Sequence, residues 1–237
     1  KLCNRHFGIG GDGIILARES SDHDMRFVII NSDGTEPEMC GNGMRCFAKY
    51  LYEKKILTQR SMRVETLAGT VIPEVFVDET DTVISIRVDM GTPELLCEKI
   101  PFVCDQGTAV EEPIEIFGGT QLVTTVSMGN PHAVIFVPDI DAVDVKGMGR
   151  AVETHERFPE KTNVEFIERV SEGRATLACG TGACAALVAA TLTKRTGNQA
   201  LVHLDGGDLE IFWDKDSGHI FKTGPATLVF EGSISIG

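Results

Sequence analysis

The chain has 237 residues, 42% of them hydrophobic, and its 22 basic and 35 acidic side chains give a net charge of −13 at pH 7. This apolar fraction supports a folded core and excludes a disordered chain, while the length allows one large domain or two small ones. An acidic balance this strong, with no basic run, argues against nucleic acid and against an anionic membrane surface as partners.

Short β-rich runs separated by Gly, Pro, Asn and Asp dominate the chain and predict strands joined by turns. Two segments predict helices instead. Residues 42–57 place Phe47, Tyr50 and Leu51 on one stripe, and residues 181–194 are apolar nearly all round, as in a helix buried inside a domain. The predicted strands are, in chain order, Arg26–Ile30, Val83–Val88, Ala133–Val137, Val164–Ile167, Leu209–Trp213 and Thr227–Phe230.

The cysteine pattern and the lack of targeting segments indicate the compartment. Seven cysteines, an odd number without a Cys-x-x-Cys pair, predict reduced and mostly buried thiols rather than a disulfide framework or a zinc site. The chain starts at Lys1 without a signal-peptide pattern, and its solidly apolar stretch, Ala183 to Leu192, is too short to span a bilayer. We therefore expect a cytoplasmic protein that does not insert into membranes.

The two predicted helices begin with the same pattern, CGNG at Cys40–Gly43 and CGTG at Cys179–Gly182. A matching glycine lies 29 residues after the first cysteine, at Gly69, and 28 residues after the second, at Gly207. The period is far too long for a solenoid. This twofold repeat predicts an α+β fold of two similar domains, each a mostly antiparallel sheet or barrel wrapped around one central helix. The predicted domains are 1–112 and 113–226.

Cys40 and Cys179 occupy equivalent positions in the two repeats, each followed by Gly-x-Gly, which lets a ligand approach the backbone closely. At a helix N-terminus, free N–H groups and the helix dipole favour the thiolate form of a cysteine and can bind a carboxylate. Two thiols on opposite sides of one cleft suit removal of a proton from one face of a carbon and its return to the other. The pattern therefore predicts racemisation or epimerisation without a pyridoxal cofactor.

Other motifs carry less weight. Gly8–Gly13 fits the dinucleotide pattern GxGxxG, with Asp33 downstream, but the residues that follow leave no room for the helix that such a site needs. His155-Glu156 lacks the second histidine of a zinc motif, and we expect no metal site. Four asparagines lie at strand ends or turns, where each alone indicates turn chemistry: Asn31, Asn42, Asn130 and Asn163.

Taken together, the motifs resemble those of the diaminopimelate epimerase family, which interconverts LL- and meso-diaminopimelate on the bacterial and plant route to lysine. The resemblance covers almost the whole chain, and the double Cys-Gly motif with Ser127–His132 (SMGNPH) is highly specific. The matching stretches are residues 8–12, 31–36, 40–46, 65–69, 127–132, 154–159, 163–166 and 178–184.

The resemblance implies a role for each matching polar position. It implies that Cys40 and Cys179 are the catalytic pair and that His132 tunes them. The substrate-binding residues that it implies are Asn31, Gly41, Asn42, Asn130, Asn163, Gly180 and Thr181. It also implies a homodimer, no metal or pyridoxal phosphate, domains that close around the substrate, and residues 227–237 returning to the first domain as a strand.

The chain departs from the family in three places. A Gly-Asn-Asp-Phe-like motif at the family's N-terminus has no counterpart, and Gly13 stands where some members carry glutamine. A Glu-Arg-Gly segment is also missing before the second cysteine, where only 16 positions separate Asn163 from Cys179, so Arg174 is not assigned the role of the family arginine. We therefore expect these residues to be part of a longer protein.

Two alternatives stay open. The first is a racemase of the same fold acting on proline or hydroxyproline, which would need smaller apolar contacts around the distal end of its substrate. The second is a non-catalytic module that uses its cysteines to bind a metal or to sense redox state. Four asparagines favour a substrate with two amino-acid ends.

Overall fold

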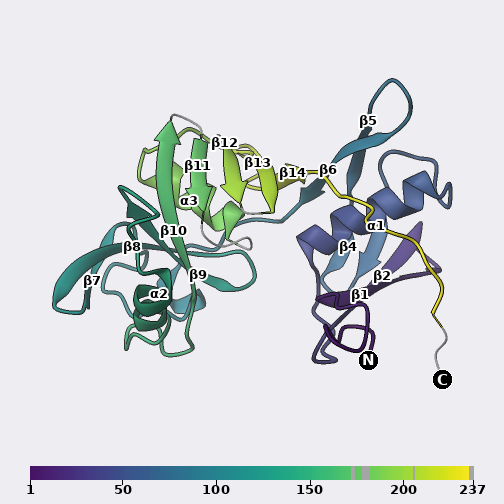
Figure 1. Cartoon of the computed structure of the whole chain (residues 1–237). Coiled ribbons are helices and arrows are strands. Elements are labelled where there is room, and N and C mark those ends of the chain that lie inside the picture. Colours follow the sequence, from purple (N-terminus) through teal and green to yellow (C-terminus); the bar gives the residue numbers. More distant parts are fainter. Residues whose placement is uncertain (172–173, 178–181, 205, 235–237) are drawn as a thin grey trace. The chain divides into compact units, whose positions relative to one another are not determined.

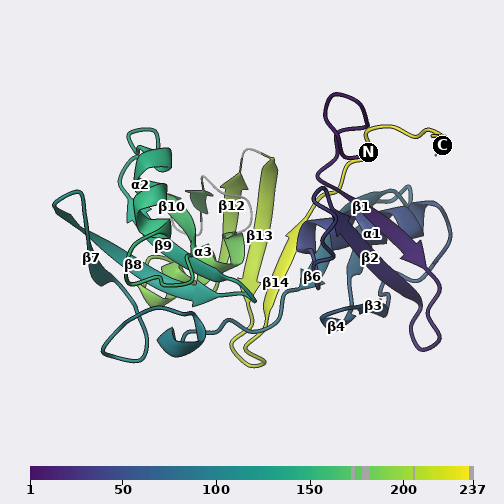
Figure 2. The same cartoon turned by 90° about the horizontal axis from the view of Figure 1, so that it is seen from below.

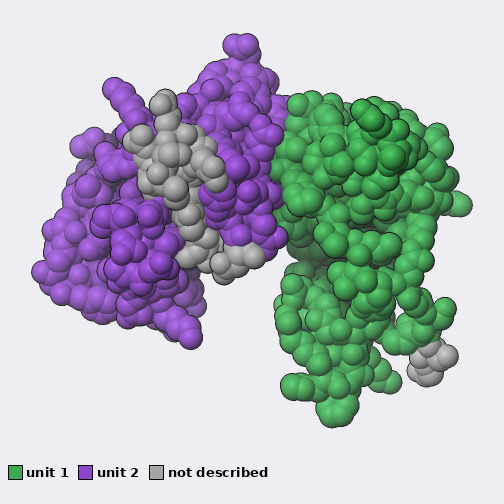
Figure 3. Space-filling model, turned by 45° about the horizontal axis from the view of Figure 1, so that its top comes forward, with its two compact units in different colours: residues 1–89, 223–237 green, residues 90–222 purple. Residues whose placement is uncertain are grey.

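The computed structural model describes residues 1–171, 174–177, 182–204 and 206–234 (Figure 1 and Figure 2). The chain divides into two compact units, unit 1 with Lys1–Asp89 and Thr223–Gly237, and unit 2 with Met90–Lys222 (Figure 3). Residues 90–112 belong to unit 2, where Glu94 and Ser127 exchange two backbone hydrogen bonds of 2.9 Å. The repeat boundary after residue 112 stays a prediction.

Unit 1 holds a four-stranded sheet in the order β1-β2-β3-β4, a hairpin of β5 and β6, and the helix α1. Only β2 and β3 pair in parallel; the other pairs are antiparallel. Helix α1 packs against β1, β2, β5 and β6. The bounds are β1 Gly13–Arg18, β2 Met25–Asn31, α1 Gly41–Glu53, β3 Val64–Thr66, β4 Gly69–Val71, β5 Glu74–Val77 and β6 Val83–Asp89.

The buried face of α1 differs in part from the predicted stripe. Phe47 and Leu51 are buried as expected, but Tyr50 is 49% exposed and Tyr52 is buried instead. Two residues along a helix differ in direction by roughly 200°, so the two tyrosines point to opposite sides. The apolar ring of Tyr52 faces the core, while its hydroxyl group contacts the turn between β5 and β6.

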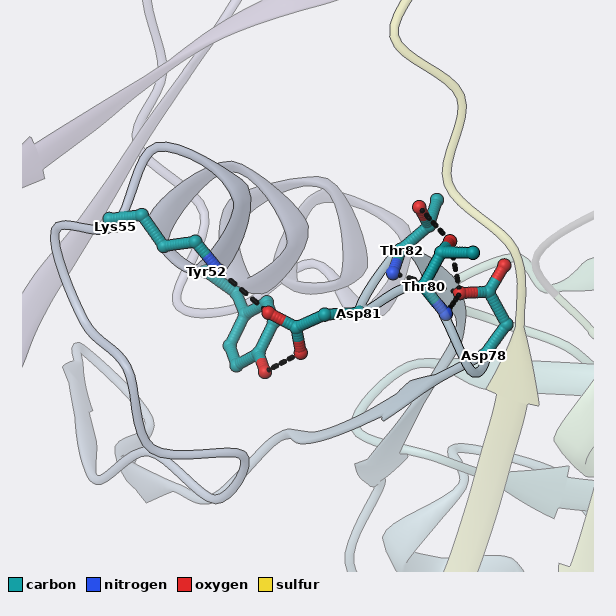
Figure 4. Close-up of polar contacts among 6 residues, drawn as sticks. All are labelled: Tyr52, Lys55, Asp78, Thr80, Asp81 and Thr82. Atoms are coloured by element: carbon teal, nitrogen blue, oxygen red, sulfur yellow. Dashed lines mark hydrogen bonds and ion pairs between the residues drawn. The ribbon is translucent and has the colours of Figure 1, made fainter.

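The turn of the β5–β6 hairpin is attached to the end of α1 through Asp81 (Figure 4). The Tyr52 hydroxyl donates to Asp81 Oδ1 at 2.6 Å, and Lys55 Nζ donates to Asp81 Oδ2 at 2.8 Å. Asp78, at the other end of the turn, accepts from the backbone N–H groups of Thr80 and Thr82 at 2.8 and 3.0 Å. These contacts close the turn and fix it to the helix.

We expect the stability of unit 1 to fall at acidic pH through Asp81. Hydrogen bonds from Lys55 and then from Tyr52 lower the pKa of Asp81 below its ordinary value. A lowered carboxyl pKa in the folded state adds stability above the unfolded pKa of about 3.9, and this is lost as the pH falls through the folded pKa. Urea unfolding at pH 6 and pH 3 should show a smaller acid effect in Asp81→Asn than in wild type.

The matched control for this prediction is Asp139→Asn, because Asp139 is an exposed carboxylate of unit 2 whose Oδ1 accepts from the backbone N–H of Asp141. Its acid response should equal that of wild type. Identical pH dependence in wild type and Asp81→Asn would contradict the assignment to Asp81.

Unit 2 is built on eight strands in the order β14-β13-β12-β11-β10-β9-β8-β7. The pairs β9–β10 and β11–β12 are parallel, and β7–β8, β8–β9, β10–β11 and β12–β13 are antiparallel. The bounds are β7 Glu112–Ile116, β8 Gly119–Ser127, β9 Pro131–Val137, α2 Val145–Glu153, β10 Asn163–Ser171, β11 Arg174–Leu177, α3 Ala183–Leu192, β12 Gln199–Leu204, β13 Gly207–Trp213 and β14 Ile220–Gly224.

Helix α3 is the core of unit 2. Every residue from Ala183 to Ala190 is buried, and the helix packs against β8, β9, β12 and β13, which confirms the predicted buried helix. Helix α2 is not evident from the sequence, because Gly147 and Gly149 lower its helix propensity. Of its residues, Val152 alone is buried in the structure. In the described part of the chain, no helix is both long and apolar enough to cross a membrane.

Both units thus confirm the α+β fold, each with a mostly antiparallel arrangement of strands around a central helix. The strand predicted at Thr227–Phe230 is wrong: residues 225–234 form neither helix nor strand. Val229 and Phe230 are 84% and 63% exposed, so the apolar run that predicted a strand lacks the sheet neighbour that a strand requires. The segment after Gly8–Gly13 is strand β1, which agrees with the rejection of a dinucleotide fingerprint.

The cysteines correct one expectation. Cys97, in the short 3-10 helix η1 (Cys97–Lys99), is disulfide-bonded to Cys104, so the prediction of reduced thiols is wrong for this pair. The odd number of cysteines in the sequence did not indicate this pair, because only the fold brings the two Cα atoms to 6.3 Å. Cys184 is buried as expected, whereas Cys46 is exposed.

Candidate active site

Cys40 is the N-cap residue of α1. Its backbone is extended, and its Sγ accepts a hydrogen bond from the N–H of Gly43 at 3.3 Å, while its carbonyl accepts from Met44 at 2.8 Å. The thiol is free and half-buried. It therefore lies at the positive end of a 13-residue helix, the position that the sequence predicted for it.

The glycines beside Cys40 let the helix start lie close to the sheet. A Cβ on Gly43 would come within 3.1 Å of Ile15 in β1 and 3.3 Å of Phe27 in β2. Gly41 and Asn42 form the first turn of α1, next to Cys40. Asn31 lies elsewhere in unit 1, at the end of β2, where its side chain donates to Thr35 at 3.0 Å in a turn.

Arg45 orients Asn42, and sequence reasoning did not single it out. Its Nη1 donates to Asn42 Oδ1 at 3.0 Å and its Nε donates to the carbonyl of Pro225 at 3.2 Å, while the residue is only 8% exposed. The signal available in the sequence was its place three residues after Asn42, one helical turn along. Arg45 thereby joins the start of α1 to the C-terminal segment of unit 1.

Three predicted site residues of unit 2 come together at the starts of two parallel strands. His132 in β9 lies opposite Asn163 in β10. Asn163 Nδ2 donates to the carbonyl of Pro131 at 2.9 Å, and His132 Nε2 lies 3.2 Å from Asn130 Oδ1. Because His132 is 1% exposed and both asparagines are exposed, the cluster presents amides to solvent above a buried imidazole.

Glu165 completes this cluster, although no motif in the sequence marks it as a site residue. Its Oε1 lies 3.0 Å from His132 Nδ1, and the side chain is fully buried. Its carboxyl also lies directly over Gly182, the N-cap of α3, where an added Cβ would come within 2.0 Å of Glu165 Cδ. The signal available was an acidic residue inside the otherwise apolar run Val164–Ile167.

Cys179, Gly180 and Thr181 lie outside the described residues, so their roles stay predictions. Within the described ranges, no group of three or more His, Cys, Asp or Glu side chains gathers as metal ligands would. A cavity of about 500 Å³ on unit 1 lies between β1 and α1, and Cys46 and Tyr50 line it. None of the predicted site residues lines this cavity.

A family model described as diaminopimelate epimerase matches residues 1–96 and 124–229. The diaminopimelate epimerase of Desulforapulum autotrophicum is 57% identical, and the alignment covers 100% of this chain and 87% of that protein. The diaminopimelate epimerase of Heliobacterium modesticaldum is 47% identical, with 100% and 88% covered. Both alignments span 247 positions against 237 residues here, so these relatives carry about ten internal positions that this chain lacks.

Solved structures share the fold at low identity. A phenazine biosynthesis protein of the PhzF family from Bacillus anthracis matches with a TM-score of 0.67 at 18% identity, covering 96% of this chain and 86% of that one. A hydroxyproline epimerase from Agrobacterium vitis matches with a TM-score of 0.59 at 16% identity, covering 89% and 71%.

Proposed function

Because this chain belongs to the diaminopimelate epimerase family, we propose that it interconverts LL- and meso-2,6-diaminopimelate, an isomerase reaction of lysine biosynthesis. The observation that carries the proposal is Cys40, a free thiol at the N-cap of α1 inside a motif that the family shares. The full coverage of the chain at 57% identity supports the same substrate.

The reaction we propose consists of two proton transfers, one from the substrate and one to it, and involves no change of oxidation state. One thiolate removes the α-proton from one face of the reacting carbon, and a thiol on the opposite face returns a proton, which inverts the centre. Cys40 supplies one of these sulfurs and Cys179 the other, and their roles exchange with the direction of reaction. The cap position of Cys40 supports its part, since the helix N-terminus favours the thiolate.

Substrate recognition falls to main-chain N–H groups and amides. Gly41 and Asn42 at the start of α1, with Gly180 and Thr181 in the second repeat, hold the carboxylate of the reacting centre. Asn31, Asn130 and Asn163 bind the distal amino and carboxylate groups. The exposed amides of Asn130, which directly precedes β9, and of Asn163, which lies opposite His132 in β10, support that division of labour.

Incubation with LL-diaminopimelate in deuterated water tests the proposal. We expect the meso isomer to form with one solvent deuterium at the inverted α-carbon, because the returning proton comes from a thiol that exchanges with solvent. L-Proline and trans-4-hydroxy-L-proline in the same assay are the controls, and both should stay unlabelled. No labelled meso isomer from folded protein would overturn the proposal, and labelling of the proline substrates would favour the alternative racemase.

A homodimer and a cytoplasmic location complete the proposal. Unit 1 carries exposed apolar side chains, among them Phe7, Ile9 and Tyr50, that are available to pack against a second copy. Sedimentation at two protein concentrations tests the dimer, and cell fractionation tests the location.

A further inference from the structure

Glu165 is a fully buried carboxylate near the start of β10, two residues after Asn163. Burying a charge is costly unless it is paired and hydrogen-bonded. Glu165 Oε1 is paired with His132 at 3.0 Å, whereas Oε2 has no hydrogen-bond partner in the described part of the chain. A buried charge that is only half satisfied, next to predicted site residues, indicates a role beyond packing.

The pairing decides which nitrogen of His132 carries a fixed proton. An ionised carboxylate can only accept hydrogen bonds, so the proton between Glu165 and His132 belongs to Nδ1. The other ring nitrogen, Nε2, lies 3.2 Å from Asn130 Oδ1, an acceptor to which a protonated Nε2 donates. By holding Nδ1, Glu165 turns Nε2 of the ring toward the exposed amides of the site.

The other neighbour of Glu165 is the start of α3. Its carboxyl lies over Gly182, three residues after Cys179 in the sequence. The first turn of this 10-residue helix contains no acidic residue, and its N-cap residue, Gly182, has no side chain that could cap it. A carboxylate at this end interacts favourably with the helix dipole. One side chain therefore contacts both His132 and the helix that follows the second cysteine.

We propose that Glu165 is a positioning residue of the epimerase: it holds His132 with the proton on Nδ1 and fixes the start of α3 against β10. The inference rests on the proposed function, in which His132 tunes the cysteine thiols. Glu165 itself touches neither reacting sulfur nor substrate in this scheme. Its removal should therefore lower kcat and leave KM nearly unchanged.

Two substitutions separate the charge of Glu165 from its acceptor. Glu165→Gln keeps an oxygen that can accept from Nδ1, and Glu165→Met keeps the volume without an acceptor. NMR of ¹⁵N-histidine-labelled protein reports which ring nitrogen is protonated, and the His132→Asn variant assigns the signals of His132. We expect a proton on Nδ1 in wild type and in Glu165→Gln, and its loss in Glu165→Met. The kcat should fall about 10-fold in Glu165→Gln and about 100-fold in Glu165→Met, with KM within about threefold.

The control is Asp208→Asn, because Asp208 forms a similar pair with His203, 2.7 Å from Nδ1, on the β12–β13 hairpin. It should leave kcat and the His132 signals unchanged. Wild-type kcat in Glu165→Gln, or an unchanged His132 ring in folded Glu165→Met, would overturn the inference. Wild-type protein without epimerase activity would instead refute the proposed function, and the ring signals would still test the positioning of His132.

Discussion

Replacing Cys40 by serine should lower the rate of diaminopimelate epimerisation by about 100- to 10,000-fold while α1 stays folded. Serine is a good N-cap residue, so its oxygen can accept the hydrogen bond that Cys40 Sγ now accepts from Gly43. A serine hydroxyl does not ionise near neutral pH, so the residue cannot act as the base, and losing general base catalysis costs about 10²- to 10⁴-fold. Initial rates with LL- and meso-diaminopimelate, alongside urea unfolding, measure both effects.

The same variant carries an isotopic signature of a two-base reaction. Cys179 should still remove and return a proton on its own face, so deuterium should enter one isomer without inversion and should not enter the other. Cys46→Ser is the matched control, since Cys46 lies on the same helix and is exposed. Full activity of Cys40→Ser, or equal losses in the two variants, would refute the role assigned to Cys40.

Replacing Gly182 by alanine should destabilise unit 2 by about 1–3 kcal/mol and also lower activity. The new Cβ would lie 2.0 Å from Glu165 Cδ and 2.1 Å from Oε1, so one side must move. The carboxyl is the far end of a flexible side chain, but it is fully buried and paired with His132, and moving it breaks that pair. Urea midpoints and kcat of the variant report the two consequences.

Gly197→Ala is the control for this prediction, because nothing lies within 4 Å of a Cβ added there. The urea midpoint of Gly197→Ala should equal that of the wild type. Adding Glu165→Ala to Gly182→Ala should restore part of the lost stability, since the two groups that collide are then no longer both present. Equal urea midpoints for Gly182→Ala and Gly197→Ala would show that the start of α3 tolerates a side chain.

Local sequence pattern determined where the two central helices lie in the chain. The apolar run of α3 predicted a buried helix, and the Cys-Gly-x-Gly motif predicted that Cys40 begins a helix, because periodicity and helix-start chemistry act over one or two turns. The same motifs identified the family, because they combine residue types that the reaction requires but that the fold alone does not require.

The sequence pattern gave wrong predictions where the structure of a segment depends on contacts with residues distant in the sequence. Thr227–Phe230 has the composition of a strand, yet a strand forms only when another edge is there to pair with it. Likewise the sequence could not tell that Tyr50 rather than Tyr52 faces solvent, or that Cys97 reaches Cys104.

The polar contacts of the site were decided by tertiary structure alone. His132 and Glu165 are 33 residues apart in sequence and meet because β9 and β10 pair in parallel at a register that puts His132 opposite Asn163. Gly182 meets Glu165 because α3 packs against the sheet. The sequence by itself therefore determined the residue types and the helix starts, while strand register and helix packing decided which side chains touch, since those contacts depend on segments that only folding brings together.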